Sequence, residues 1–320
     1  MPTRPDVLVI GAGVNGLTCA LALADAGAYV EVVAEEVPGT TSLAAGALWG
    51  PYLVEPRDLV RGWALDTYAV LAELAQDGAS GVRMTRGIEA AREPAPPPDF
   101  TDMVPDLAVL GGEQLPRGFA SAVAYTAPLV DMPVYLAFLR ERLDRAGARI
   151  RRGRIGSLAE AAALAPCVVN AAGCGARALA DDESLFSIRG QLVVVENPGI
   201  TEWFSEDTGT APELTHWYPH GDLLVLGGQA ALNDWSLDPD PAVARAIVQR
   251  CAAIESALAG ARIIGHRVGL RPTRPQIRCE AEFVGGSLVV HCYGHGGAGV
   301  SLSWGCARHV QSLIQQHAAL

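Results

Sequence analysis

Residues 7–16, VLVIGAGVNG, decide the fold of this chain. The first four are an unbroken apolar run, which is typical of a parallel strand buried on both faces. Glycines follow in the pattern GxGxxG, and the apolar residues of 17–24 then recur at helical spacing. A strand, a glycine-rich turn and a helix in this order predict a dinucleotide-binding unit at the start of the chain.

Each position of the turn has a physical role in such a unit. Gly11 makes the tight turn, Gly13 lets a pyrophosphate approach the backbone, and Gly16 lets the helix pack closely on the strand. The phosphates lie at the helix N-terminus with Val14 and Asn15, where free N–H groups and the helix dipole attract anions. We therefore predict that these five residues bind a cofactor.

The second strand is predicted at residues 28–36. Its end and the segment that follows it indicate which dinucleotide the protein binds. Glu35 lies 19 residues after Gly16, where an acid accepts hydrogen bonds from ribose hydroxyls and repels a 2′-phosphate, so NADP is not expected. In residues 38–52 the chain continues with hydroxyls and small residues rather than with another short βαβ unit, which favours FAD over NAD. The predicted cofactor contacts of this segment are Thr40, Thr41, Ser42, Ala45 and Gly46.

The composition of the chain argues against several classes of binding partner. The chain has 320 residues, a formal net charge of −11 and a pI near 5.1, which argues against nucleic acid or an anionic membrane as the main partner. No uncharged apolar run reaches membrane-spanning length, and the first residues do not form a signal peptide, so we expect a cytoplasmic protein. The seven cysteines show no CxxC spacing and the histidines no ligand spacing, which predicts free thiols and no metal.

The order of elements predicts an α/β protein with two domains. A Rossmann-like FAD-binding domain is expected from residues 1–55, 136–190 and 265–320, so it is discontinuous, and a mixed-sheet α+β substrate-binding domain from 56–135 and 191–264. We expect helices at 57–76, from Asp131 to Gly147, at 239–258 and from 304 onward. Strands are expected at 167–170, 189–197, 222–228 and 287–294.

Five motifs spread over nearly the whole chain resemble the D-amino acid oxidase family of flavoproteins, which includes the D-aspartate oxidases. They are VIGAGVNGLTCAL, AAGALWGPYL, VVNAAG, VGLRPTRPQIR and VVHCYGHGGAGVSLSWGCA, the last two being specific to this family and its glycine-oxidase relatives. The resemblance implies oxidative deamination, with a hydride passing from Cα of a D-amino acid to flavin N5. The imine then hydrolyses to a 2-oxo acid and ammonia, and O2 reoxidises the flavin to give hydrogen peroxide. The resemblance leaves open whether the protein forms a homodimer.

The resemblance also implies the residues of the site. Arg271, the arginine of the first Arg-Pro pair, binds the substrate carboxylate, for which a planar guanidinium has the matching bidentate geometry. The carbonyl of Gly297 accepts a hydrogen bond from the substrate amine. Main-chain amides are expected to face the pyrimidine edge of the flavin and to stabilise the charge that develops there, and they belong to Gly296, Gly297, Ala298, Gly299, Val300 and Ser301.

The sequence departs from the family pattern at two places. We expect the substrate lid within residues 199–220. The family has a tyrosine three residues before the proline of this lid, and this chain has His216 at that position. Either His216 or Tyr218 then supplies the second hydrogen bond to the carboxylate, and a structural role for His216 stays open.

D-aspartate oxidases have an arginine after the LGG strand, where this chain has Gln229 and Ala230. We therefore expect neutral or apolar substrates.

Three alternatives remain open from the sequence. The first is a flavin oxidase or dehydrogenase of another amine, such as glycine, sarcosine, D-aspartate or a biosynthetic intermediate. The second is a nucleotide-binding protein without catalytic activity. The third is an NAD-dependent dehydrogenase. Fold alone does not rank these functions, whereas Arg271 and the glycine-rich loop at 296–301 favour the amino acid oxidase.

Overall fold

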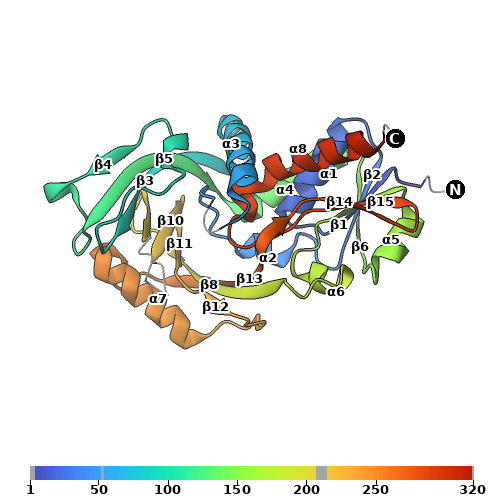
Figure 1. Cartoon of the computed structure of the whole chain (residues 1–320). Coiled ribbons are helices and arrows are strands. Elements are labelled where there is room, and N and C mark those ends of the chain that lie inside the picture. Colours follow the sequence, from blue (N-terminus) through green and yellow to red (C-terminus); the bar gives the residue numbers. More distant parts are fainter. Residues whose placement is uncertain (1–3, 52–53, 207–214, 319–320) are drawn as a thin grey trace.

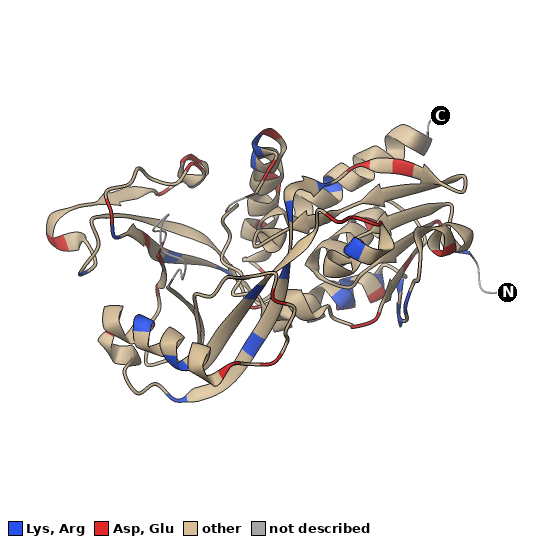
Figure 2. Cartoon of the chain, turned by 60° about the horizontal axis from the view of Figure 1, so that its bottom comes forward, with Lys and Arg blue, Asp and Glu red and all other residues tan. Residues whose placement is uncertain are grey.

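The computed structural model describes residues 4–51, 54–206 and 215–318. The predicted α/β class is confirmed, and the strands form two sheets in two halves of the molecule (Figure 1). Figure 2 shows acidic and basic residues interspersed over both halves, so the net negative charge is not gathered on one element. Among the described residues, no helix combines the length and the apolar character needed to cross a bilayer.

The first sheet contains six strands in the order β14-β15-β7-β1-β2-β6. Five of them pair in parallel, and β14 is antiparallel to β15. Their bounds are β1 Val7–Ile10, β2 Val30–Ala34, β6 Arg149–Arg152, β7 Cys167–Asn170, β14 Ala281–Val284 and β15 Ser287–His291.

Helices cover both faces of this sheet, which is why its central strands are apolar throughout. On one face α1 (Val14–Asp25), α4 (Met132–Arg145) and α8 (Gly299–Ala318) pack in the core that contains Val7 and Val9. On the other face α5 (Leu158–Leu164) packs on Leu8 and Ile10. The short α2 (Thr40–Ala44) and α6 (Ala176–Leu179) follow strands β2 and β7, and single 3-10 turns occur at Thr101–Met103, Gly112–Gln114, Gly173–Gly175 and Ser256–Leu258.

The second sheet contains ten strands in the order β16-β13-β8-β11-β10-β9-β3-β5-β4, with β12 paired to β8. Their bounds are β3 Val82–Ala91, β4 Ala108–Leu110, β5 Ser121–Val130, β8 Phe186–Glu196, β9 Trp203–Glu206, β10 His216–His220, β11 Leu223–Gly227, β12 Ala231–Leu232, β13 Ile263–Arg278 and β16 Tyr293–His295. One face packs on α7 (Pro241–Ile254) through a separate apolar cluster that includes Trp217, Leu226 and Ile247. Because side chains alternate along a strand, His216 and Tyr218 point to the opposite face.

Several predicted elements differ from those observed. The predicted strand 287–294 is two strands, because the chain leaves the first sheet after His291 and enters the second at Tyr293. Helix α8 begins at Gly299 rather than at 304, so half of the predicted glycine loop is its first turn. Helix α7 starts at Pro241, where the Asp240 side chain accepts hydrogen bonds from the first turn, and not at 239.

The two sheets give the chain a discontinuous organisation, and the predicted domain bounds stay a prediction. Strands β13 and β16 join the second sheet, although they fall within the segment 265–320 that the sequence assigns to the first domain. Helix α3 (Arg57–Leu74) lies against α8, so closely that a Cβ on Gly305 would be 2.2 Å from Cα of Trp63.

Candidate active site

The three glycines of the first turn are required for two different reasons. Gly11 has a φ of +110°, and a Cβ there would lie 2.3 Å from the carbonyl oxygen of Ala171, while a Cβ on Gly16 would lie 2.0 Å from the carbonyl oxygen of Gly11. These two glycines are therefore needed for packing. A Cβ on Gly13 would meet, within 4 Å and among the described residues, only Oγ of Ser42 at 3.1 Å. Gly13 thus leaves the space in front of α1 open.

The N-terminus of α1 is lined by polar groups. The amide of Val14 donates to Oγ of Ser42 over 2.9 Å, which places the predicted Ser42 at the end of the helix. Oδ1 of Asn15 is buried and has no hydrogen-bond partner within the described part of the chain. A Cβ on Gly299 would lie 3.1 Å from Nδ2 of Asn15, so the first turns of α1 and α8 meet here. Two helix N-termini and an unpartnered buried amide oxygen fit an anionic dinucleotide.

The other residues predicted from this segment are placed differently. Thr41 Oγ1 donates to the carbonyl of Leu270 over 3.0 Å, so it ties α2 to β13 instead of facing the phosphate region. Thr40, the first residue of α2, is exposed. Glu35 follows β2 directly, and its carboxylate lies 3.4 Å from Nε of Arg154 on the surface. Ala45 ends α2 next to Gly46, which lies under the ring of Tyr218.

The glycine loop offers fewer free amides than the sequence predicts. Gly296 donates to the carbonyl of Pro272 over 2.8 Å and Ala298 to that of His295 over 2.9 Å, so the prediction that these two amides face a flavin needs correction. The other four predicted amides have no acceptor among the described residues. Three of them are in the first turn of α8, where N–H groups lack intrahelical partners, and the fourth precedes the helix. They belong to Gly297, Gly299, Val300 and Ser301. The Ser301 hydroxyl itself bonds to the backbone of Gly50.

Arg271 lies between the two halves of the molecule beside this loop. A Cβ on Gly190 would come within 2.7 Å of its guanidinium nitrogens, and one on Gly297 within 3.7 Å of its Cδ. Its Nη1 donates to the carbonyl of Gln229 over 3.1 Å, and no carboxylate of the described residues forms an ion pair with it. Burial lowers the pKa of Arg271. A desolvated guanidinium without an acid is costly, and it forms a ready site for a carboxylate brought by a ligand.

The other two arginines of the motif form ion pairs within the protein. Arg274 lies 2.8 Å from the carboxylate of Asp182, and Arg278 lies 2.7 Å from that of Glu280. The structure also adds two residues that sequence reasoning missed. Gly190 makes room for the Arg271 guanidinium, and the Gln229 carbonyl orients it. A glycine in an apolar strand is the only signal that could have indicated the first of these.

Tyr218 and His216 lie on the sheet face that carries Arg271. Their rings stack with centroids 4.7 Å apart, and a Cβ on Gly227 would lie 2.0 Å from Nε2 of His216. Burial raises the pKa of Tyr218, against the effects of a hydrogen bond with Ser205 and of the nearby Arg271, so its phenol is neutral and can donate. The predicted lid, residues 199–220, includes 207–214, which lie outside the described residues.

His220 lies further along the same face and gives a testable pH effect. Burial lowers its pKa to about 4, with Asp131 opposing and Arg83 and Arg267 adding to the shift. Because the folded pKa is below that of the unfolded chain, the unfolded state binds the proton first and stability falls as pH drops from about 6.5 toward about 4. We expect protonation of this group to lower the free energy of unfolding by on the order of 3 kcal/mol over that pH range. In His220→Leu this part of the pH dependence should be absent, as measured by urea unfolding at several pH values. Equal pH slopes for the two proteins would contradict it.

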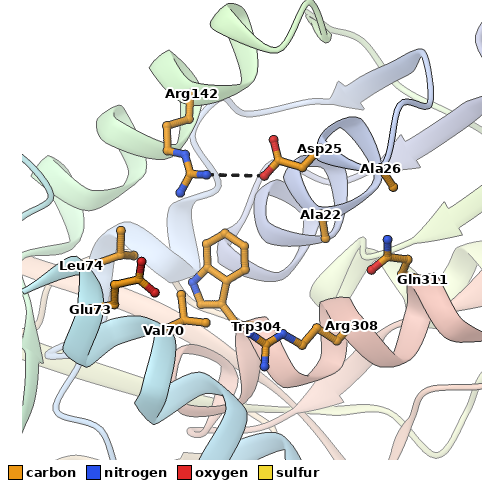
Figure 3. Close-up of a pocket in the computed structure, with 10 residues that line it drawn as sticks. All are labelled: Ala22, Asp25, Ala26, Val70, Glu73, Leu74, Arg142, Trp304, Arg308 and Gln311. Atoms are coloured by element: carbon orange, nitrogen blue, oxygen red, sulfur yellow. Dashed lines mark hydrogen bonds and ion pairs between the residues drawn. The ribbon is translucent and has the colours of Figure 1, made fainter.

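A separate surface hollow lies away from this site (Figure 3). It is lined by the C-terminal end of α1 and by α3, α4 and α8, and an ion pair of 3.4 Å between Arg142 and Asp25 crosses it. The open glycines of α1 are at the other end of that helix. The hollow includes none of the predicted site residues.

The fold, with two helix N-termini beside a buried arginine, is that of a dinucleotide-dependent oxidoreductase. Residues 6–313 match the family described as FAD dependent oxidoreductase (DAO), and the chain belongs to that family. FAD is thus its cofactor, and the residues around α1 and α8 are suited to hold it.

Known proteins similar to this chain agree with the assignment. It is 45% identical over 309 residues to the D-amino-acid oxidase of Rubrobacter xylanophilus, covering 96% of this chain and 94% of that protein. It is 43% identical over 316 residues to the D-amino-acid oxidase of Streptomyces coelicolor, covering 96% of each. The crystal structure of glycine oxidase from Geobacillus kaustophilus has the same fold, with a TM-score of 0.81 at 18% identity over 98% of this chain and 95% of that one.

Proposed function

We propose that this protein catalyses the FAD-dependent oxidative deamination of neutral D-amino acids to 2-oxo acids and ammonia. Molecular oxygen is the electron acceptor and hydrogen peroxide the second product, in the cytoplasm. The observation that carries the proposal is the buried Arg271 guanidinium beside the open amides of the glycine loop, without a carboxylate among the described residues. The two bacterial relatives named D-amino-acid oxidase support the substrate class.

The residues of the site bind and orient the substrate. Arg271 holds the α-carboxylate with two parallel N–H groups, and the neutral phenol of Tyr218 donates to the same carboxylate. The carbonyl of Gly297 accepts a hydrogen bond from the amine and so orients it. Bound FAD supplies the acceptor for the hydride from Cα. Because Arg271 and Tyr218 fix the substrate, orientation and exclusion of water account for most of the rate, and no side-chain base is needed.

The neighbours of Arg271 support a neutral substrate side chain. Gln229 follows β11, where D-aspartate oxidases are expected to carry an arginine. Its Oε1 accepts from Arg189 over 2.7 Å. The remaining nitrogens of Arg189 donate to Gln191 and to the carbonyls of Ser236 and Asp238. All three nitrogens of Arg189 therefore already have acceptors, and the carboxylate of Asp234 lies 3.8 Å from Nε, so Arg189 is poorly placed to bind a second substrate carboxylate.

A substrate screen on FAD-loaded protein tests the function. D-alanine, D-leucine and D-aspartate, their L-enantiomers, glycine and sarcosine would be compared by oxygen uptake and peroxide formation. We expect turnover of the neutral D-amino acids and little of the L-enantiomers. Preference for sarcosine, for L-amino acids or for D-aspartate would refute the proposal, as would turnover that depends on added NAD. Light scattering of the same sample tests whether the protein is a homodimer.

Replacing Tyr218 separates the two candidates for the second hydrogen bond. Tyr218 lies close enough to Arg271 for each to influence the pKa of the other, whereas the His216 ring stacks on Tyr218 and lies over Gly227. We expect Tyr218→Phe to keep the ring contacts and to raise KM for a D-amino acid about 10-fold, the cost of one hydrogen bond to a charged group. His216→Phe serves as the matched control with a smaller effect. The reverse order of the two effects would assign the role to His216.

A further inference from the structure

Two cysteines and a histidine meet behind the glycine loop. The donor atoms of Cys292, His295 and Cys306 all lie within 4.8 Å of one another, and Sγ of Cys292 is 3.9 Å from Nε2 of His295. The three residues are 1%, 3% and 0% exposed, so bulk solvent does not reach them. All seven cysteines of the chain are free thiols.

Two more thiols adjoin this group. Sγ of Cys19 lies 4.0 Å from Sγ of Cys292. Cys279 is close enough to Cys292 and Cys306 for these two thiols to influence its pKa. Cys19 and Cys279 therefore lie beside the group of three, and a small side-chain movement would bring either of them into it. The five residues come from α1, the residue after β13, the crossover between β15 and β16, β16 itself and α8.

We propose that Cys292, His295 and Cys306 bind a single thiophilic cation, Zn²⁺, with Cys19 or Cys279 as the fourth ligand. Thiolate and imidazole are the donors that zinc takes in closed structural sites, at about 2.3 and about 2.0 Å. Ligands at those lengths around a tetrahedral ion are about 3.5 to 4 Å apart, which matches the observed separations within a small side-chain adjustment. Hard cations such as Mg²⁺ and Ca²⁺ require oxygen ligands, and this group has none.

Binding of zinc displaces a proton from each thiol that becomes a ligand, and no electron is transferred. The sequence predicts no metal because the ligands come from separate segments of the chain, whose spacing matches no local motif. Their positions give the ion a structural role. His295 precedes the loop glycines directly, and Cys292 stands where the chain crosses from one sheet to the other. Cys306 is on α8, whose first turn faces the cofactor space. A cation there fixes the base of the glycine loop against α8.

Metal analysis of the flavin-loaded protein tests the site. Protein from zinc-supplemented cells, purified without chelator, is expected to contain about one zinc per chain by mass spectrometry. Cys292→Ala and Cys306→Ala should reduce this to background, whereas Cys251→Ala should not. Cys251 is a matched control because it is equally buried and free, but lies on α7. Cys19→Ala and Cys279→Ala identify the fourth ligand by partial loss.

Cobalt substitution needs no variant, so its result holds even if a cysteine variant fails to fold. Cobalt substituted into the wild-type protein should give the d–d bands of a tetrahedral thiolate site at wavelengths beyond the flavin absorbance. A chelator should lower the melting temperature of the wild type but not that of Cys292→Ala. Zinc below about a tenth of an ion per chain after supplementation, or full zinc in the Cys292→Ala/Cys306→Ala double variant, would overturn the proposal.

Discussion

Arg271→Met is expected to lower kcat/KM for a neutral D-amino acid on the order of 10³-fold while the protein keeps its flavin. Truncating one partner of a buried, hydrogen-bonded charge pair costs about 2 to 5 kcal/mol, and each 1.4 kcal/mol is about tenfold in rate or affinity. Methionine fills much of the volume of the arginine stem between Gly190 and Gly297, so the fold should persist. Steady-state kinetics and the flavin absorbance of the purified variant measure the two effects separately.

Arg271→Lys is the matched control for charge. Lysine keeps the positive charge but cannot present two parallel N–H groups to a carboxylate, so we expect a loss smaller than that of Arg271→Met but still substantial. If both variants oxidise D-amino acids at nearly the wild-type rate, Arg271 does not bind the substrate carboxylate. If both lose flavin, the residue supports the cofactor site instead.

The parts of the fold that the sequence predicts are those set by contacts along short stretches of chain. The turn at Gly11, Gly13 and Gly16 needs only its own strand and helix, and it is found where predicted. The strand at 263–278 is different, because Pro272 and Pro275 would normally exclude a long paired strand. It forms because β13 pairs with β8 up to Thr273 and then with β16, with an irregularity between Thr273 and Arg278.

The candidate site was predictable in its residue types rather than in its geometry. Arg271 was identified from a motif, but its isolation from carboxylates is a property of the packed sheet, as is the space made by Gly190. Among the neighbouring hydroxyls, Ser42 reaches the α1 N-terminus while Thr41 turns to the Leu270 carbonyl, and helix α2 decides between them. Spacing in sequence could not distinguish these two residues.

The second large effect is expected at Gly13, and it tests the cofactor site without disturbing the protein framework. At Gly11 and Gly16 a side chain would collide with backbone, so loss of flavin there could follow from misfolding. Gly13 has an ordinary φ of −77°, and its Cβ would approach only the Ser42 hydroxyl among the described residues. A side chain at this position therefore needs a small shift of the Ser42 hydroxyl rather than of backbone, and it enters the space in front of α1.

We expect Gly13→Val to weaken FAD binding about 100-fold or more, because its methyl groups keep a pyrophosphate from the α1 N-terminus, an overpacking cost of up to about 3 kcal/mol. Flavin content after gel filtration and fluorescence titration of the apoprotein measure this loss, and circular dichroism checks that the fold remains. Gly62→Ala is the matched control, since a Cβ on that exposed α3 glycine meets nothing within 4 Å and should leave FAD affinity unchanged. Wild-type affinity in Gly13→Val would place the cofactor phosphates elsewhere, and the functional assignment of the Gly11–Gly16 turn would then be wrong.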